Sequence, residues 1–178
     1  MYLAEFAAQR EPLEAWQRAL RGAAPYRLTV RIACDAGAIV GGIAFERYPR
    51  SGCGLVTYMV VAPEARRAGL GRALYDGAAR ALYGDGARLV VGEVARGQPE
   101  RIARFVRWGA RVLDVRYVQP ALGPGLARDA ELALIALPPV PDPVPGEAVR
   151  AFIVELYAAT EGGPPEPGLV EAIADRVG

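Results

Sequence analysis

The best candidate for chemistry in this chain is a basic, glycine-containing turn between an apolar segment and a helical pattern. The apolar segment covers 55–61, Pro63 ends it, and a helical pattern follows over 70–82. The turn reads Arg66, Arg67, Ala68, Gly69, Leu70, Gly71 and Arg72. Such a turn presents several backbone N–H groups at the positive end of a helix dipole, with arginines around them. This arrangement binds anions, and a diphosphate is the expected ligand.

Two common phosphate loops do not fit this turn. The Walker loop needs a lysine before its serine or threonine, and the chain contains no lysine. The dinucleotide fingerprint needs a third glycine three residues after Gly71, where this chain has Leu74. The turn therefore binds another diphosphate, or it is an ordinary strand-to-helix connection whose glycines allow tight packing.

Together with its strand, proline and helix, the segment 61–74 resembles motif A of the GCN5-related N-acetyltransferase (GNAT) superfamily. That motif reads Val-x-Pro, then Arg/Gln-x-x-Gly-x-Gly/Ala, then a helix. Here the Val-x-Pro part is 61–63 and the Arg-to-Gly part is 66–71. The resemblance implies a mixed, mostly antiparallel sheet flanked by helices, with acetyl-CoA as the acyl donor.

The resemblance also implies which residues bind the acyl donor, because in this superfamily it lies along the strand before motif A. The opened edge at Met59, Val60 and Val61 would pair with the pantetheine amides as an extra strand does. A backbone N–H near Val60 or Val61 would stabilise the oxyanion. The diphosphate would contact backbone N–H groups and arginines of the turn. These implied ligands are Arg66, Arg67, Ala68, Gly69, Leu70, Gly71 and Arg72.

Further along, this chain has the residue spacing of the GNAT superfamily but a different residue type at two positions. Glu93 is present in the expected neighbouring strand, whereas Gln98 replaces an asparagine and Phe105 replaces a tyrosine. Gln98 can still hydrogen-bond the acyl donor, so Gln98 and Phe105 remain candidate cofactor-binding residues. A phenyl ring cannot protonate a thiolate, so the usual general acid is missing unless another group replaces it.

The general base is also absent from the family's usual positions. Leu55 and Thr57 stand there, and neither side chain can accept the proton. If 49–52 forms a tight hairpin turn, Glu46 pairs with Leu55 and faces the same side of the sheet. This register makes Glu46 a candidate base, the alternative being a solvent-facing carboxylate near a turn.

Three further side chains on the expected strands can exchange protons. Glu93 is a second candidate base, although family members often keep this carboxylate for structure. Tyr58 and Tyr117 are candidate proton donors, although tyrosines on strands more often fill cores. Proton exchange through water, or an amine with a low pKa, would need none of these residues.

The composition excludes several classes of chemistry. The 178 residues carry a net charge of +1, so no overall field attracts nucleic acid or a membrane. The chain has no histidine, hence no histidine base, triad or metal ligand, and its two cysteines make neither a disulfide framework nor a zinc site. No metal is expected. The lack of a long apolar run or a signal peptide predicts a soluble, cytoplasmic protein.

The patterns along the chain predict an α+β fold with a mixed sheet. The expected strands are 26–33, 38–48, 55–61, 88–94, 111–118 and 130–137, and the expected helices are 11–21, 70–82 and 98–108. Short turns join the first three strands into an antiparallel meander. The GNAT fold has this order over 26–137. It usually begins with a further strand, which only 2–6 could supply.

Beyond residue 137 the composition changes, which suggests a division into an acyltransferase domain, 1–137, and an extension, 138–178. The segment 138–145 is rich in proline and predicts a stiff linker. Helices are expected over 147–160 and 169–177. This extension packs on the core, contacts a second subunit or closes over the substrate.

Three functions remain open from the sequence. The first is an acetyl-CoA-dependent N-acetyltransferase acting on a small-molecule amine or a protein amino group. The second is a catalytically weak or inactive acyl-CoA-binding module of the same fold, and the third is an unrelated binder of phosphate-bearing ligands. No recognisable code specifies the acceptor. Dimerisation is common in the family, and the exposed face of the 147–160 helix could serve a homodimer.

Overall fold

The computed structural model describes residues 11–66 and 69–178. The expected first strand, 2–6, and the expected diphosphate ligands Arg67 and Ala68 lie outside the described residues. Within the described ranges, no helix is long and apolar enough to cross a membrane.

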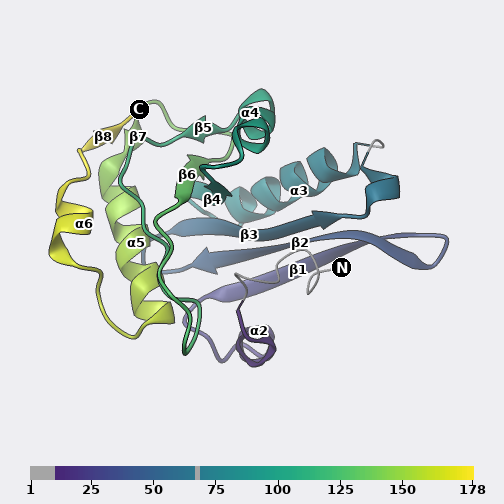
Figure 1. Ribbon diagram of the computed structural model, residues 1–178, viewed down its shortest axis with the longest axis horizontal. Coiled ribbons are helices and arrows are strands. Elements are labelled where there is room, and N and C mark those ends of the chain that lie inside the picture. The colour runs from purple at the N-terminus through teal and green to yellow at the C-terminus, as the bar shows by residue number, and fades with distance from the viewer. Residues whose placement is uncertain (1–10, 67–68) are drawn as a thin grey trace.

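A six-stranded mixed sheet forms the centre of the molecule (Figure 1). Its strands, in spatial order, are β1 (Arg27–Asp35), β2 (Ala38–Tyr48), β3 (Cys53–Val61), β4 (Leu89–Ala95), β6 (Leu132–Ala136) and β5 (Arg111–Val112). Neighbours pair antiparallel except β3 and β4, which are parallel. The predicted α+β class and the predicted meander of three strands are confirmed.

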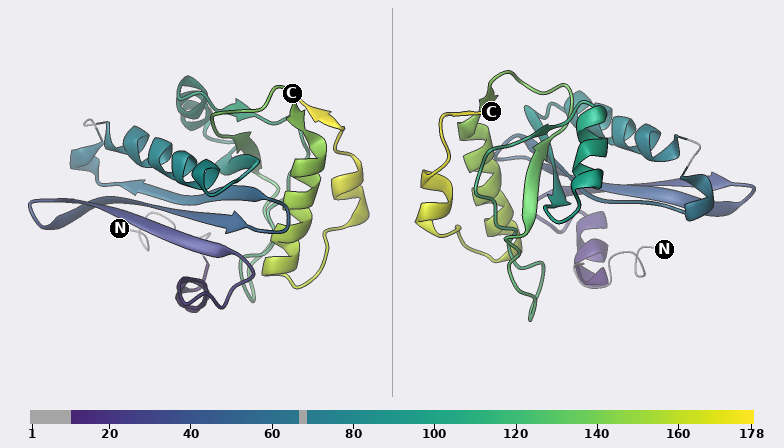
Figure 2. Two further views of the ribbon diagram at one scale, coloured as in Figure 1. Left: turned by 180° about the vertical axis from the view of Figure 1, so that it is seen from behind. Right: turned by 45° about the horizontal axis from the view of Figure 1, so that its top comes forward.

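Helices lie on both sides of this sheet, as Figures 1 and 2 show. They are α2 (Leu13–Leu20), α3 (Leu70–Gly84), α4 (Pro99–Arg107), α5 (Gly146–Thr160) and α6 (Pro167–Glu171), with a short 3₁₀ turn at Pro63–Ala65. Side chains of α3 and α4 share one hydrophobic cluster with the strands, whereas α2 and α5 contribute to the other. Gly54 lets α3 approach β3, since a β-carbon there would lie 2.8 Å from Leu82 Cδ1.

The hairpin between β2 and β3 has the predicted register. Tyr48 lies opposite Cys53 and Glu46 opposite Leu55, with the Gly52 N–H donating to the Tyr48 carbonyl at 3.1 Å. The local turn therefore sets which face of the sheet Glu46 occupies.

The expected strand 111–118 is wrong beyond its first two residues. Leu113, Val115 and Tyr117 are buried alternately, which produced the strand-like pattern. However, the Val115 N–H donates to the Leu113 carbonyl at 2.9 Å, and this tight turn takes the chain out of the sheet.

The expected final helix, 169–177, is also corrected. It is only the short α6, after which β8 (Arg176–Val177) pairs with β7 (Val144–Pro145) at the end of the proline-rich segment. This pairing brings the two segments so close that a β-carbon on Gly146 would lie 1.7 Å from the Ala174 carbonyl oxygen.

The helix α5 packs on the core. Phe152, Ile153 and Tyr157 are fully buried in the cluster that α5 shares with the strands. The buried Glu155 carboxylate accepts the backbone N–H of Arg50 at 3.0 Å and of Ser51 at 2.6 Å, which ties α5 to the β2–β3 turn. The homodimer stays a prediction, and the only large apolar side chain that α5 leaves exposed is Val154.

Candidate functional site

The strands β3 and β4 separate partway along the sheet. Their parallel pairing ends where Val56 lies opposite Gly92. Beyond this point β3 stays paired with β2, and β4 pairs with β6. Within the described part of the chain, no strand covers the other edge of β3 from 57 to 61. Backbone polar groups on this edge are available to an extended ligand.

A β-bulge at Thr57 lies where the strands separate. Ala44 is opposite Tyr58 and Phe45 is opposite Val56, so Thr57 has no partner on β2. Its hydroxyl donates to the Ala44 carbonyl at 3.1 Å. A bulge bends its strand and increases the local twist, which turns the end of β3 away from β4.

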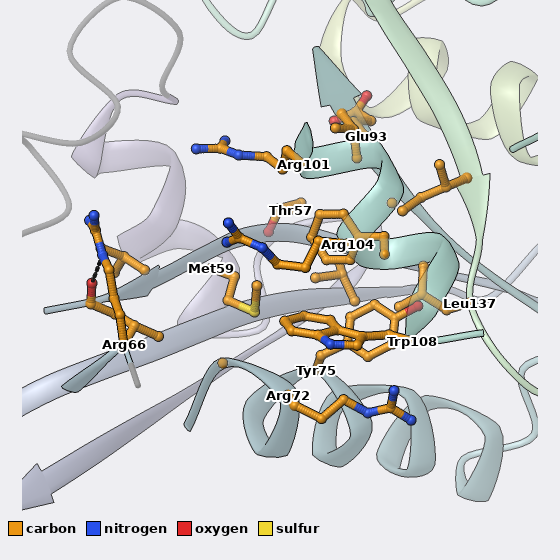
Figure 3. Close-up of a pocket in the computed structure, with 18 of the residues that line it drawn as sticks. Thr57, Met59, Arg66, Arg72, Tyr75, Glu93, Arg101, Arg104, Trp108 and Leu137 are labelled. Carbon is orange, nitrogen blue, oxygen red and sulfur yellow. Dashed lines mark hydrogen bonds between the residues drawn. The ribbon is translucent and has the colours of Figure 1, made fainter. Parts of the chain in front are cut away.

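The separation opens a cleft of about 680 Å³, which we call the β3–β4 cleft (Figure 3). Its walls come from β3, α3, β4 and α4. Residues expected from the sequence that line it are Met59, Val60, Val61, Arg66, Gly69, Gly71, Arg72, Glu93 and Phe105. Leu70 begins α3 but does not line the cleft, and Gln98 lines a neighbouring cavity instead.

The N-terminus of α3 forms one end of the cleft. Gly69 is the N-cap residue with φ of +73°, a left-handed conformation that strains any residue with a β-carbon. The first turn of a helix leaves N–H groups without partners inside the helix, and the dipole makes this end positive. The predicted combination of a glycine turn and a helix N-terminus is thus present.

The arginines around the cleft differ in how far they are engaged. Arg66 Nε donates to the Val61 carbonyl at 3.1 Å. Arg72 Nε pairs with Asp76 Oδ2 at 2.6 Å, and its guanidinium lies 5.9 Å from the Trp108 ring centroid. In Figure 3 Arg72 points away from Arg66 and Arg104. The Asp76 pair thus directs the Arg72 charge along α3.

Sequence reasoning missed two arginines of the cleft, Arg101 and Arg104 on α4. Both are exposed and line the cleft, and neither side chain makes a hydrogen bond or ion pair with the described residues. Their spacing of three residues, on one face of a helix expected next to the acyl donor, was the available signal. They supply two positive charges that no described carboxylate neutralises and that an anionic ligand could contact.

Phe105, which stands where the resemblance implies a proton-donating tyrosine, belongs to a group of aromatic rings. Phe105 packs against Tyr75 at 5.5 Å and against Trp108 at 5.4 Å between ring centroids. All three rings line the β3–β4 cleft. The Tyr75 hydroxyl is buried without a hydrogen-bond partner among the described residues, and burial raises its pKa.

A second cavity, of about 350 Å³, adjoins the β3–β4 cleft, and we call it the acidic cavity. Its lining includes the carboxylates Glu11, Glu46 and Glu93. It shares Thr57, Glu93, Val94 and Arg101 with the β3–β4 cleft. The two spaces therefore meet where β3 and β4 separate.

Glu46 lines the acidic cavity together with Leu55, its partner across the hairpin. Its side chain is almost fully buried, and the Tyr48 hydroxyl donates to Oε2 at 2.6 Å. Burial raises the pKa of Glu46 well above its usual range; Glu11 and Glu93 raise it further, and the Tyr48 hydrogen bond only partly opposes this. A carboxylate with a raised pKa is suited to accept a proton near neutral pH.

Glu93 lies at the junction of the two spaces. The Tyr117 hydroxyl donates to its Oε1, and Gln119 Nε2 donates to Oε2 at 2.8 Å. Burial raises the pKa of Glu93, against the lowering effect of these hydrogen bonds. Tyr117 is therefore engaged with Glu93.

Glu11 is the third carboxylate, and sequence reasoning missed it. Its backbone N–H donates to the Tyr58 hydroxyl at 3.1 Å, and the Tyr26 hydroxyl donates to Oε1 at 3.4 Å. Burial raises its pKa, and Glu93 adds repulsion. Tyr58 lines the acidic cavity and not the β3–β4 cleft, so it lies on the side of the carboxylates.

Across the described ranges, no group of His, Cys, Asp or Glu side chains is placed to hold a metal ion. The acidic cavity offers carboxylates that can accept protons, and the β3–β4 cleft offers an unpaired part of the β3 edge, a helix N-terminus and arginines to an extended anion.

Comparison with known families matches residues 2–109 to the acetyltransferase (GNAT) family. Among solved structures, a GNAT-family protein from Bacteroides thetaiotaomicron is similar, with a TM-score of 0.55 and 18% identity over 76% of this chain and 78% of that chain. PaiA N-acetyltransferase from Thermoplasma acidophilum, solved with coenzyme A, has a TM-score of 0.52 and 14% identity over 70% of this chain and 67% of that one.

Nourseothricin acetyltransferase is 27% identical with a TM-score of 0.49, over 64% of this chain and 65% of its own. The chain thus spans less than two thirds of that protein. A search of curated proteins finds no match.

Proposed function

Because the chain belongs to the acetyltransferase (GNAT) family, we propose that it transfers an acetyl group from acetyl-CoA to a primary amine. The main support for this proposal is that the β3–β4 cleft and the acidic cavity adjoin where β3 and β4 separate. One is suited to an extended anionic donor and the other to an amine. The volume of about 350 Å³ for the acidic cavity favours a small-molecule acceptor over a folded protein surface.

The β3–β4 cleft fits coenzyme A in shape and charge. Its free β3 edge at Met59, Val60 and Val61 would pair with the pantetheine amides. The first turn of α3 after Gly69 would bind the diphosphate, and Arg104 would add a charge-assisted contact.

The reaction forms a bond between the amine nitrogen and the acetyl carbonyl carbon while the carbon–sulfur bond breaks. The amine arrives as an ammonium ion and must first lose a proton, which Glu46 or Glu93 would accept. A backbone N–H of the free β3 edge would stabilise the negative charge on the carbonyl oxygen. The attacking nitrogen loses a second proton as the amide forms, and the departing thiolate takes it up, directly or through water, and leaves as the thiol of coenzyme A.

Phe105 favours a second candidate, a weakly active or inactive acyl-CoA-binding module. The phenyl ring cannot give the thiolate its proton, and the nearest hydroxyl of the aromatic group, on Tyr75, is buried. Such a module would bind acetyl-CoA without releasing coenzyme A when amines are added.

The test is calorimetric titration with acetyl-CoA and coenzyme A, with ATP and NAD as controls, followed by an assay of thiol release with a panel of primary amines. Micromolar binding of coenzyme A, weak binding of the controls and amine-dependent thiol release would support acetyl transfer. Binding without thiol release would favour the inactive module. No preference for coenzyme A over ATP and NAD would overturn both.

We also propose that residues 1–137 carry the acyltransferase domain and that 138–178 extend it. The support is that α5 adds Leu156 and Thr160 to the acidic cavity. The extension would then shape the acceptor site rather than form a separate functional unit.

A further inference from the structure

The acidic cavity contains more carboxyl groups than the proposed proton transfer requires. Glu11, Glu46 and Glu93 all line it, and within residues 11–66 and 69–178 none of them has an ion pair. Buried carboxylates are normally paired, because an uncompensated charge is costly to remove from water. The proposed reaction needs only one of these carboxylates as its base, so the other two have no assigned function in proton transfer.

The three carboxylates differ in how fully the protein satisfies them. Both oxygens of Glu93 accept hydrogen bonds, from Tyr117 and Gln119. Glu46 receives one at Oε2, from Tyr48, and Oε1 receives none from the described residues. Glu46 lines the cavity and is only 2% exposed, so its carboxyl group is shielded from bulk water.

The positions of the carboxylates divide the cavity into two parts. Glu93 borders the β3–β4 cleft, where the acetyl group would be presented. Glu11 and Glu46 line the acidic cavity but not the cleft. Arg101 is the one basic side chain among the described residues that lines the cavity; it also lines the cleft and is exposed. Among the described residues, no basic side chain lines the part of the cavity that Glu11 and Glu46 border away from the cleft.

Resting on the proposed function, we infer that the acceptor is a small molecule with at least two ammonium groups, one that gives its proton to Glu46 or Glu93 and reacts, and another that is bound by Glu11. Leu55, Leu132 and Leu156 also line the cavity and fit an aliphatic spacer between the two charges.

The inference is tested with two amines of equal length, hexylamine and hexamethylenediamine, at equal ionic strength. The values of kcat/KM are measured by thiol release, and the affinity of each amine for the enzyme saturated with coenzyme A is measured by calorimetry. We expect the diamine to exceed the monoamine by about tenfold or more in both, since one charge-assisted hydrogen bond has this value. Glu11→Gln should reduce the ratio, and Glu171→Gln, an exposed glutamate on α6, should preserve it.

The outcomes distinguish failure of the inference from failure of the proposed function on which it rests. Acetyl transfer with equal kcat/KM for both amines, or a ratio that Glu11→Gln leaves unchanged, would overturn the inference and leave the proposed function standing. If the protein neither binds acetyl-CoA nor transfers an acetyl group to either amine, both the proposed function and the inference are overturned. The comparison of the two amines uses the unmodified protein, so it holds even if Glu11→Gln does not fold.

Discussion

The hydroxyl of Tyr48 donates a 2.6 Å hydrogen bond to Oε2 of Glu46, two residues earlier on the same face of β2. The bond holds one carboxylate oxygen, while the other accepts no hydrogen bond from the described residues and Glu46 lines the acidic cavity. It also stabilises the ionised form of Glu46 against the larger effect of burial. This pair therefore sets both the position and the pKa of the proposed base.

Replacing Glu46 by glutamine should lower turnover and leave donor binding intact. The amide keeps the size of the side chain but cannot accept the proton, and general base catalysis typically contributes about 10²–10⁴-fold. We expect kcat to fall by about 100-fold or more, with an unchanged Kd for acetyl-CoA by calorimetry. Unchanged kcat would exclude Glu46 as the base and leave Glu93, which Glu93→Gln would then test.

Replacing Tyr48 by phenylalanine should move the pH dependence of turnover. The hydroxyl lowers the pKa of Glu46, so its loss raises that pKa further above the usual range. Because the base must be ionised, the pH of half-maximal kcat/KM should move upward. A profile at the same position as that of the unmodified enzyme would show that Glu46 does not control the acidic limb.

The register that places Glu46 could be predicted because a short turn between Tyr48 and Cys53 determines it locally. Gly69 was predictable for a similar reason, since its conformation depends on the adjoining helix. Glu11 was not, because its contact with Tyr58 joins residues 47 positions apart. Long-range packing leaves no local periodicity to read.

The error at 111–118 has a related physical origin. Alternating burial at Leu113, Val115 and Tyr117 is the signal of a strand, yet those side chains are buried by α5 and other elements, not through strand pairing. A pattern of burial therefore predicted the inward-facing residues correctly and the backbone pairing wrongly. Likewise, Arg72 and Asp76 are four residues apart on α3, a spacing that permits their ion pair. The sequence alone does not show whether Arg72 pairs with Asp76 or contacts a phosphate.

The acidic cavity should make the protein less stable as the pH rises. Glu46 has a folded-state pKa raised above the ordinary value of 4.5, and the pKa values of Glu11 and Glu93 are raised as well. The folded state then holds protons that the unfolded chain has released. The contribution of these carboxyl groups to the free energy of unfolding is therefore fully present below pH 4.5 and is lost as the pH rises through their folded-state pKa values.

Glu46→Gln should therefore flatten this loss. The free energy of unfolding, measured by urea denaturation across this pH range, should fall less steeply with pH in the variant than in the unmodified protein. Glu171→Gln should follow the unmodified protein. Parallel curves for all three proteins would contradict the raised pKa of Glu46.

Arg104→Ala should weaken acetyl-CoA binding more than Arg72→Ala. Arg104 lines the β3–β4 cleft and has no partner among the described residues, whereas Arg72 is already paired with Asp76. Loss of one charge-assisted contact costs about 1.5–3 kcal/mol, which is about tenfold or more in Kd. Arg107→Ala is the matched control, because Arg107 is exposed on the same helix but does not line the cleft. Calorimetry with acetyl-CoA at constant salt measures all three, and equal losses for Arg104→Ala and Arg107→Ala would show that α4 contributes only general positive charge to binding.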